Sequence, residues 1–161
     1  MNLSIKGLEK AKILTAKVDL ENKKLSTEIY FDKLDFTGTY LVNGRILILP
    51  IQGHGRAEIS FGDIIIRFYT EYELLNNNGT DYMNLTNSKV SYTVKRAAYN
   101  LKDLFNGDEF LGEQTNKFLN ENWKDLHQEF SPAIAGSIKT VVLKILTRIL
   151  DVVPFNEIFL P

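Results

Sequence analysis

The sequence contains no cysteine, which excludes a disulfide, a thiolate zinc site and a cysteine nucleophile within this chain. Its two histidines, His54 and His127, lie far apart in different predicted elements, so a metal role for either is not favoured. Opposite charges nearly cancel, leaving a net charge of -1. Because nucleic acid binding depends on clustered lysine and arginine, we expect no nucleic acid partner. The apolar residues 138–150 include three basic side chains and are too few to span a bilayer, so we expect no stable membrane insertion.

Sequence patterns of known catalytic sites are also missing, because neither an H-E-x-x-H helix motif nor a G-x-S-x-G nucleophile elbow occurs. Glu71 and Glu73 share one face of a predicted strand and could act as an acid and base pair, but a solvated strand face also explains them. Gly53-His54-Gly55 is followed by a strand instead of a helix, which favours a turn or bulge over a phosphate-binding loop. We therefore expect no catalytic residue, no metal and no cofactor.

No signal peptide is visible, because Met1 is followed at once by a strand-like pattern. This beginning suggests a truncated gene model or a chain that has lost its first part. N-glycosylation sequons start at Asn2, Asn78 and Asn84, and the last two lie near a predicted turn where a glycan could be accepted.

Residues 3–49 alternate apolar and polar side chains, which is the period-two pattern of half-buried strands. The pattern predicts a strand at residues 14–20, a polar turn at 21–24 and a second strand that continues past Lys33. Near that lysine the apolar residues change from one face of the strand to the other, which indicates a β-bulge. Asn43-Gly44 predicts a hairpin turn.

The longest predicted strand covers residues 56–75, with a one-residue change of apolar phase that indicates a bulge at Gly62-Asp63. It follows a continuous apolar strand at residues 45–51 that Pro50 is expected to stop. Because the connections are short, an antiparallel meander is predicted. The remaining elements are a loop at residues 76–81, a strand at 83–94, a bend at 95–100 and a short strand at 101–105.

The last third of the chain predicts two helical parts, residues 108–130 and 131–153, with Ser131-Pro132 marking either a kink or a true break. Pro154 ends the second part. The second part has an apolar arc of about half its circumference, wider than the usual surface stripe of about 100°. Such an arc suits a helix gripped by a strongly curved sheet. The arc consists of Ile134, Ile138, Val141, Val142, Ile145, Leu146, Ile149, Val152 and Val153, with Lys139 intruding.

Two smaller groups of apolar residues also occur in the last third of the chain. Trp123 and its helical neighbours could form a stacking platform for a flat ligand, although their spacing favours ordinary core packing. The apolar tail must dock somewhere on the fold, and it consists of Phe155, Ile158, Phe159 and Leu160.

Three separated motifs, in this order along the chain, resemble the takeout and haemolymph juvenile-hormone-binding family of insects. The similarity covers nearly the whole sequence. The first motif is Gly38-Thr39-Tyr40 with Asn43-Gly44-Arg45-Ile46-Leu47-Ile48-Leu49-Pro50-Ile51 and Gly53-His54-Gly55. The second is Leu104-Phe105-Asn106-Gly107-Asp108 with Leu111-Gly112, Asn116 and Phe118-Leu119-Asn120-Glu121-Asn122-Trp123. The third is Val153-Pro154-Phe155-Asn156-Glu157-Ile158-Phe159.

The resemblance implies an α+β fold in which a long C-terminal helix is wrapped by a strongly curved antiparallel sheet, related to the tubular lipid-binding superfamily. It implies a secreted, non-enzymatic carrier that holds a small lipophilic ligand in an internal tunnel. The ligand class implied is a terpenoid like juvenile hormone, a fatty acid or another long apolar molecule. We expect one ligand-binding domain over residues 1–161, acting as a monomer and lacking the signal peptide and disulfide-bearing N-terminal segment usual in this family.

The apolar pattern of the strands and the helix predicts which side chains line the tunnel, since small-molecule sites are mostly apolar and concave. Core packing alone would also account for each of these side chains. The alternative functions are a lipid-transfer or membrane-surface protein, whose apolar tail would touch a bilayer, and a hydrolase of hormone esters. The predicted tunnel residues are Leu47, Leu49, Ile64, Ile66, Phe68, Tyr72, Val90, Tyr92, Phe130, Ile134, Ile138, Val141, Val142 and Ile145.

Overall fold

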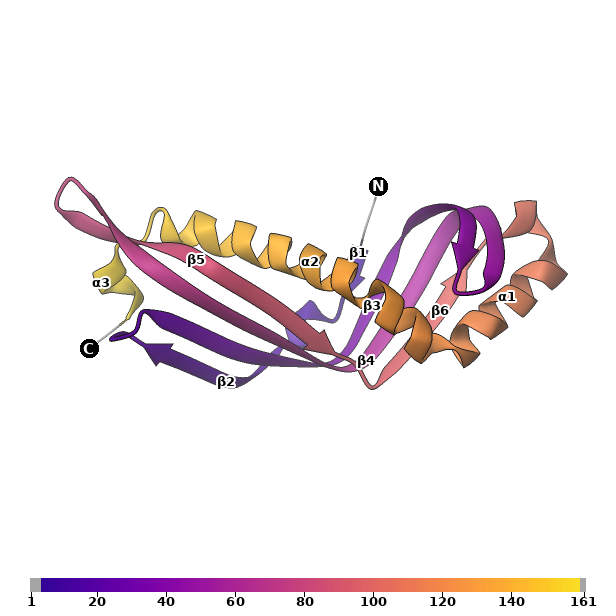
Figure 1. Ribbon diagram of the computed structural model, residues 1–161, viewed down its shortest axis with the longest axis horizontal. Helices are drawn as coiled ribbons and strands as arrows, with labels where there is room; N and C mark the ends of the chain where they lie inside the picture. The colour runs from indigo at the N-terminus through magenta and orange to yellow at the C-terminus, as the bar shows by residue number, and fades with distance from the viewer. Residues whose placement is uncertain (1–3, 160–161) are drawn as a thin grey trace. The chain divides into compact units, whose positions relative to one another are not determined.

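The computed structural model describes residues 4–159 and confirms an α+β fold with an antiparallel sheet and a long C-terminal helix (Figure 1). Strands β3, β4 and β5 are neighbours in the sheet, with β1 and β2 pairing with β3 and with β6 pairing with β4. The strands are β1 (Ser4–Lys6), β2 (Lys12–Asp19), β3 (Lys24–Ile46), β4 (Leu49–Asn77), β5 (Thr80–Thr93) and β6 (Arg96–Leu101). The helices are α1 (Glu109–Glu121), α2 (Trp123–Leu150) and α3 (Phe155–Ile158), with 3-10 turns η1 (Leu8–Lys10) and η2 (Phe105–Gly107). Asn2 and Leu160 lie outside the described residues.

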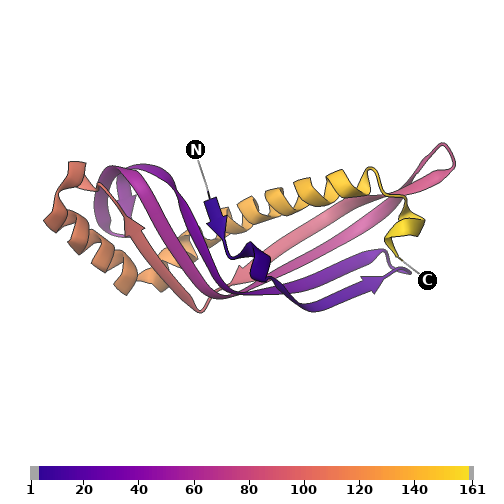
Figure 2. The same ribbon diagram turned by 180° about the vertical axis from the view of Figure 1, so that it is seen from behind.

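The chain divides into two compact units. Unit 1 comprises Met1–Lys12, Tyr30–Ile65 and Thr93–Pro132, and unit 2 comprises Ile13–Ile29, Ile66–Tyr92 and Ala133–Pro161. Strands β3 and β4 and helix α2 each contribute residues to both units. Within unit 1, β3 and β4 bend strongly as they approach the turn that joins them (Figures 1 and 2).

The predicted irregularity at Gly62-Asp63 is present in β4. Asp63 has a left-handed backbone with φ of 51°, which is uncommon for a residue with a side chain. Phe61 and Ile64 are both buried although three positions separate them, so the inward-facing phase changes between them. Asp63 is held there by a 2.8 Å hydrogen bond from the Tyr30 hydroxyl and a 3.0 Å ion pair with Arg96.

The hairpin turn predicted at Asn43-Gly44 is wrong, and so is the stop at Pro50. Strand β3 continues through Asn43-Gly44, the chain turns at Leu47-Ile48, and β4 already includes Pro50. Leu47 adopts the positive φ of 54° that the turn requires. The register of two long strands decides this position, because contacts along the ladder, such as Ser60 to Asp35, outweigh one local turn preference.

The final strand was also misplaced, because β6 is Arg96–Leu101 and not residues 101–105. Its residues pair with Gly62 back to Ala57 of β4, which makes the bend predicted at residues 95–100 part of the strand. Leu104 forms only an isolated bridge to Gly53. A Cβ on Gly53 would lie 2.9 Å from the Leu104 Cα, so the glycine permits the close backbone approach predicted for this segment. The predicted antiparallel meander is correct for β2 to β5, in which consecutive strands pair with each other. It is wrong for β1, which pairs with β3, and for β6, which pairs with β4.

The helical break lies at Asn122 and not at Ser131-Pro132. The Asn122 backbone N–H and the Asn122 side chain both donate to the Phe118 carbonyl, at 3.0 and 2.8 Å, and so close the end of α1. Helix α2 then begins at Trp123 and runs through Pro132. Proline leaves the carbonyl four residues earlier without its helical donor. That residue, Gln128, is exposed, so water can take the place of the donor.

Two asparagines attach α1 to β6 in unit 1. The Asn116 side chain accepts from the Leu101 backbone N–H at 2.8 Å and donates to the Leu101 carbonyl at 2.9 Å. Asn120 makes the same pair of bonds with Tyr99, both at 2.8 Å. Because the asparagines are one helical turn apart and their partners are two residues apart on a strand, the helix supplies the hydrogen bonds that a neighbouring strand would supply. Leu119, on the same helix, is almost completely buried.

The core of unit 2 is a cluster built on Tyr72, Met83 and Leu150. Leu146 of α2 packs against it, and the Tyr72 ring lies 5.9 Å from the ring of Phe155. The apolar tail docks on this cluster through the residues that the structure describes, which are Phe155, Ile158 and Phe159.

Candidate functional site

The apolar arc of α2 is only partly covered in unit 2. Leu150 is buried and Leu146 packs against the Tyr72 cluster. The flank beside them, however, is open to solvent: Val141 is 58% exposed, Ile145 54% and Ile149 50%. These three residues follow one another at intervals of four, so they form one continuous strip along the helix.

Strand β2 exposes a second set of apolar side chains in the same unit. Leu14 is 50% exposed and Val18 is 49% exposed. Counting back from the turn at residues 20–23 places Val18 opposite Leu25, which belongs to the apolar cluster of the unit. The apolar face of β2 is therefore on the side of the sheet that α2 covers farther along.

We call these exposed residues, Leu14, Val18, Leu20, Val141, Ile145 and Ile149, the open apolar surface of unit 2. Each apolar Å² removed from water contributes about 25 cal/mol, so a chain-like apolar molecule lying on these side chains would be bound mainly by burial. Neither the sheet nor the helix supplies that cover within the described part of unit 2.

The predicted tunnel residues occupy three kinds of position, and their contact with a ligand remains a prediction. Leu47, Leu49, Ile64 and Phe130 belong to unit 1, and the structure brings the rest together in unit 2. The buried ones are Ile64, Phe68, Tyr72 and Tyr92. The half-buried ones are Leu47, Leu49, Ile66, Val90, Ile134, Ile138 and Val142. The exposed ones are Phe130, Val141 and Ile145.

Four members of the open apolar surface were not among the predicted tunnel residues: Ile149 of α2, which was predicted only as part of the apolar arc, and Leu14, Val18 and Leu20. The signal of the three strand residues was present as the period-two alternation of residues 14–20. Alternation identifies the face of a strand but does not say whether a helix covers that face. The structure leaves Leu14, Val18 and Leu20 about half exposed, at 50%, 49% and 52%.

Unit 1 contains a groove of about 340 Å³ that differs in character from the open apolar surface. Its two cations are already paired, Lys33 with Asp35 at 2.9 Å and Arg96 with Asp63 at 3.0 Å. Both cations that line the groove are therefore neutralised, and its remaining charged side chain is the carboxylate of Asp32. The groove is lined by Asp32, Lys33, Ser60, Phe61, Gly62, Arg96, Ala97 and Ala98.

The carboxylate pair Glu71 and Glu73 is engaged on the outer face of the sheet. Glu71 accepts a 2.7 Å hydrogen bond from the Tyr69 hydroxyl, which lowers the pKa of the glutamate. Glu73 accepts from the Asn84 amide at 2.7 Å. A general acid at neutral pH needs a raised pKa, and Glu71 has the opposite shift. Among residues 4–159, no three histidine, aspartate or glutamate side chains are gathered to hold a metal ion.

The ring of Trp123 is not freely accessible for stacking, since it is half-buried and the Lys124 ammonium lies 5.9 Å from its ring centroid.

No helix in the described part of the chain is long and apolar enough to cross a membrane.

The stability of the folded protein should depend on pH through His127 of α2, which lies in unit 1. Its half-buried ring stands edge-on to Phe61, with centroids 5.8 Å apart, and burial lowers its pKa. The unfolded chain therefore takes up a proton below about pH 6.5 before the folded chain does, and stability should fall as pH drops through that value. We expect His127→Phe to reduce the loss of melting temperature between pH 7.5 and 5.5. His54→Gln, at an exposed position, should leave it unchanged. Equal slopes for both variants and wild type would rule out this role.

Residues 1–160 match the family model described as haemolymph juvenile hormone binding protein. The chain is 28% identical over 137 residues to the circadian clock-controlled protein daywake of Drosophila melanogaster, covering 84% of this chain and 53% of that protein. Daywake of Drosophila yakuba matches with the same identity and coverage. The chain thus spans about half the length of the curated relatives it matches. The crystal structure of Epiphyas postvittana Takeout 1 superposes with a TM-score of 0.89 at 32% sequence identity, covering 96% of this chain and 72% of that one.

Proposed function

Because this chain belongs to the haemolymph juvenile hormone binding protein family, we propose that it is a non-enzymatic carrier that holds a small lipophilic molecule in unit 2. The family is one of binding proteins for small hydrophobic ligands. The observation that carries the proposal is the open apolar surface, where a helix and an edge strand of one unit both leave large apolar side chains uncovered. The ligand is a terpenoid like juvenile hormone, a fatty acid or another long apolar molecule.

The direct test is recovery and displacement of a ligand. We expect organic extraction of the purified full chain, followed by mass spectrometry, to release a hydrophobic small molecule. We also expect a neutral fluorescent probe, N-phenyl-1-naphthylamine, to bind and to be displaced by long-chain lipids. An empty extract together with no probe binding would contradict the carrier function.

A membrane-surface role is the alternative, and its main support was the apolar tail. Phe155, Ile158 and Phe159 are instead partly buried against the core cluster of unit 2, which reduces the apolar area that they could offer to a bilayer. We therefore expect the protein to stay in the supernatant when mixed with phosphatidylcholine vesicles. Co-sedimentation would favour the alternative.

We also propose that residues 1–161 act as one ligand-binding domain and as a monomer. Strands β3 and β4 and helix α2 each run through both units, so the units share backbone. A single cooperative unfolding transition, independent of protein concentration, is expected.

We propose that the protein is extracellular and carries its ligand in haemolymph or sensory fluid. A secreted chain can be N-glycosylated, and the environment of each sequon indicates which one accepts the glycan. Asn78 is exposed at the tip of the β4–β5 hairpin, with φ of 52° and no side-chain hydrogen bond among the described residues. The Asn84 amide, by contrast, donates to Glu73 from within β5. In an Asn2→Gln background secreted from insect cells, Asn78→Gln should abolish a glycosidase-sensitive mobility shift, whereas Asn84→Gln should retain it. The opposite pattern would contradict this assignment.

A further inference from the structure

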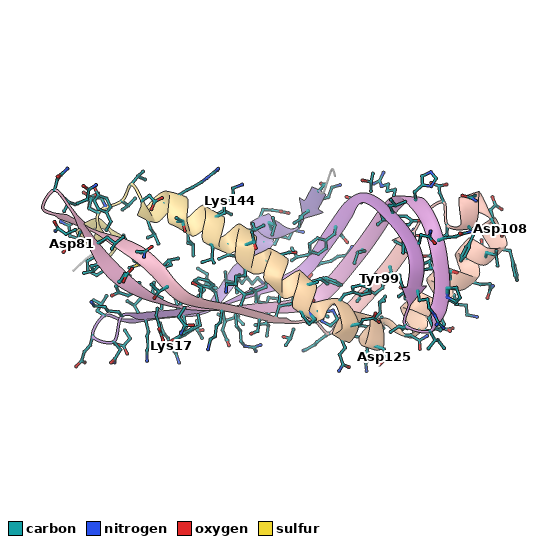
Figure 3. All side chains as sticks on the ribbon, turned by 45° about the horizontal axis from the view of Figure 1, so that its top comes forward. Lys17, Asp81, Tyr99, Asp108, Asp125 and Lys144 are labelled. Carbon is teal, nitrogen blue, oxygen red and sulfur yellow. The ribbon has the colours of Figure 1, made fainter. Side chains whose placement is uncertain are left out.

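Lys139 lies on the packed side of α2 in unit 2. It precedes Leu146 by seven residues, which is close to two helical turns, so the two side chains leave the helix in nearly the same direction. Leu146 packs against the Tyr72 cluster, and Lys139 is itself half-buried. Lys144 differs, because it is exposed on the opposite side of the helix, as labelled in Figure 3.

No carboxylate neutralises Lys139. It takes part in none of the ion pairs formed by residues 4–159. The acidic side chains on the unit 2 segments of β3 and β4 are bound elsewhere. Their bonds, all of 2.7 Å, are Glu28 to Arg67, Glu71 to Tyr69 and Glu73 to Asn84.

Those bonds also show which face of the sheet these acids occupy. Arg67, Tyr69, Glu71 and Glu73 alternate along β4 with the buried residues Phe68, Thr70 and Tyr72, so they point away from the side that α2 covers. None of these acidic side chains of β4 therefore lies on the side that α2 covers. The packed side of α2, in contrast, carries one lysine, Lys139.

Lys139 is half-buried on the apolar side of α2, and no ion pair among residues 4–159 compensates its charge. The flexible stem of lysine lets the charge reach the edge of an apolar surface. An anion arriving there with its own apolar chain would form a charge-assisted hydrogen bond while the chain covers exposed carbon. Val142 is the neighbour of Lys139 at i+3, and Val142 in turn neighbours Ile138 and Ile145 along the flank; Ile138 and Val142 are both half-buried.

We propose that Lys139 binds the carboxylate of a long-chain monocarboxylic acid whose apolar chain lies on the open apolar surface of unit 2. This assignment rests on the proposed carrier function and narrows its ligand to an anionic amphiphile. Lys139 thereby sets both the head-group preference and the direction in which the ligand lies.

The test compares hexadecanoic acid with its methyl ester at pH 7.5, by displacement of N-phenyl-1-naphthylamine from the full chain. The wild-type protein should bind the acid about tenfold more tightly than the ester, as expected for one charge-assisted contact in a partly desolvated site. Lys139→Met should reduce acid binding to the level of the ester and leave ester binding unchanged. Lys139→Arg should retain the preference, and Lys144→Met, a matched change on the exposed side, should retain it as well.

Equal affinity of wild type for acid and ester, or an acid preference that survives in Lys139→Met, would overturn the role of Lys139 while leaving the carrier function intact. Tighter, Lys139-dependent binding of a lysophosphatidic acid would overturn the choice of carboxylate. If the probe does not bind and neither lipid protects the protein against thermal unfolding, the carrier function itself fails. Melting temperatures of all variants without lipid exclude loss of folding as a cause.

Discussion

Replacing Asn120 by leucine is expected to lower the free energy of unfolding by about 2–4 kcal/mol, because it removes the side-chain partner of both the N–H and the carbonyl of half-buried Tyr99. The Asn120 amide accepts from the Tyr99 N–H and donates to the Tyr99 carbonyl, each at 2.8 Å. Leucine has a similar volume but no polar atoms, so the Tyr99 backbone would lose the two hydrogen bonds that Asn120 provides. The quantity to measure is the midpoint of urea unfolding, with the slope checked for two-state behaviour.

Gln114→Leu provides the matched control, since Gln114 is exposed on the same helix. We expect that change to alter stability by less than about 0.5 kcal/mol. Asn116→Leu should resemble Asn120→Leu, because Asn116 makes the equivalent bonds to Leu101. If both asparagine variants were as stable as the control, α1 would not be attached to β6 through these side chains.

The second large effect concerns binding. Ile145→Glu should weaken binding of a lipophilic ligand by at least about tenfold, because burying a side chain of this size contributes about 1.5–3 kcal/mol and a buried carboxylate is unfavourable. Ile145 is 54% exposed, so the folded chain can keep the glutamate in water. The measurement is titration with N-phenyl-1-naphthylamine, accompanied by a melting curve.

Thr147→Glu is the control for charge on the same helix, since Thr147 is exposed on the polar side. It should leave the dissociation constant within about twofold of wild type. Loss of binding in both variants would indicate a general charge effect, and unchanged binding in Ile145→Glu would remove the exposed flank of α2 from the site.

Features carried by hydrophobic pattern were predictable from the sequence. The change of apolar phase located the distortion at Gly62-Asp63. The wide apolar arc on the last helix was expected to be enclosed by the curved sheet, and this expectation holds for only part of the arc. The structure explains the excess width: Leu146 and Leu150 use one part of the arc, and Val141, Ile145 and Ile149 remain open.

The sequence did not predict features in which a local turn or helix-start preference competes with contacts between residues far apart in the chain. Asn43-Gly44 is a good turn sequence, but strands of 23 and 29 residues impose a register that turns at Leu47-Ile48. Ser131-Pro132 is a good helix start, but the helix tolerates Pro132 while Asn122 closes the preceding helix with its own side chain. Asn116 and Asn120 were recognisable as part of a family motif, yet their partnership with β6 depends on a helix and a strand meeting in space.

Photoaffinity labelling tests the central claim most directly. The full chain would be irradiated with hexadecanoic acid carrying a diazirine in its chain, digested and mapped by mass spectrometry. The account predicts adducts on peptides containing residues 14–20 and 138–149, both suppressed by excess unlabelled acid. Adducts confined to other segments, or labelling that excess acid does not suppress, would contradict a ligand site on the open apolar surface of unit 2.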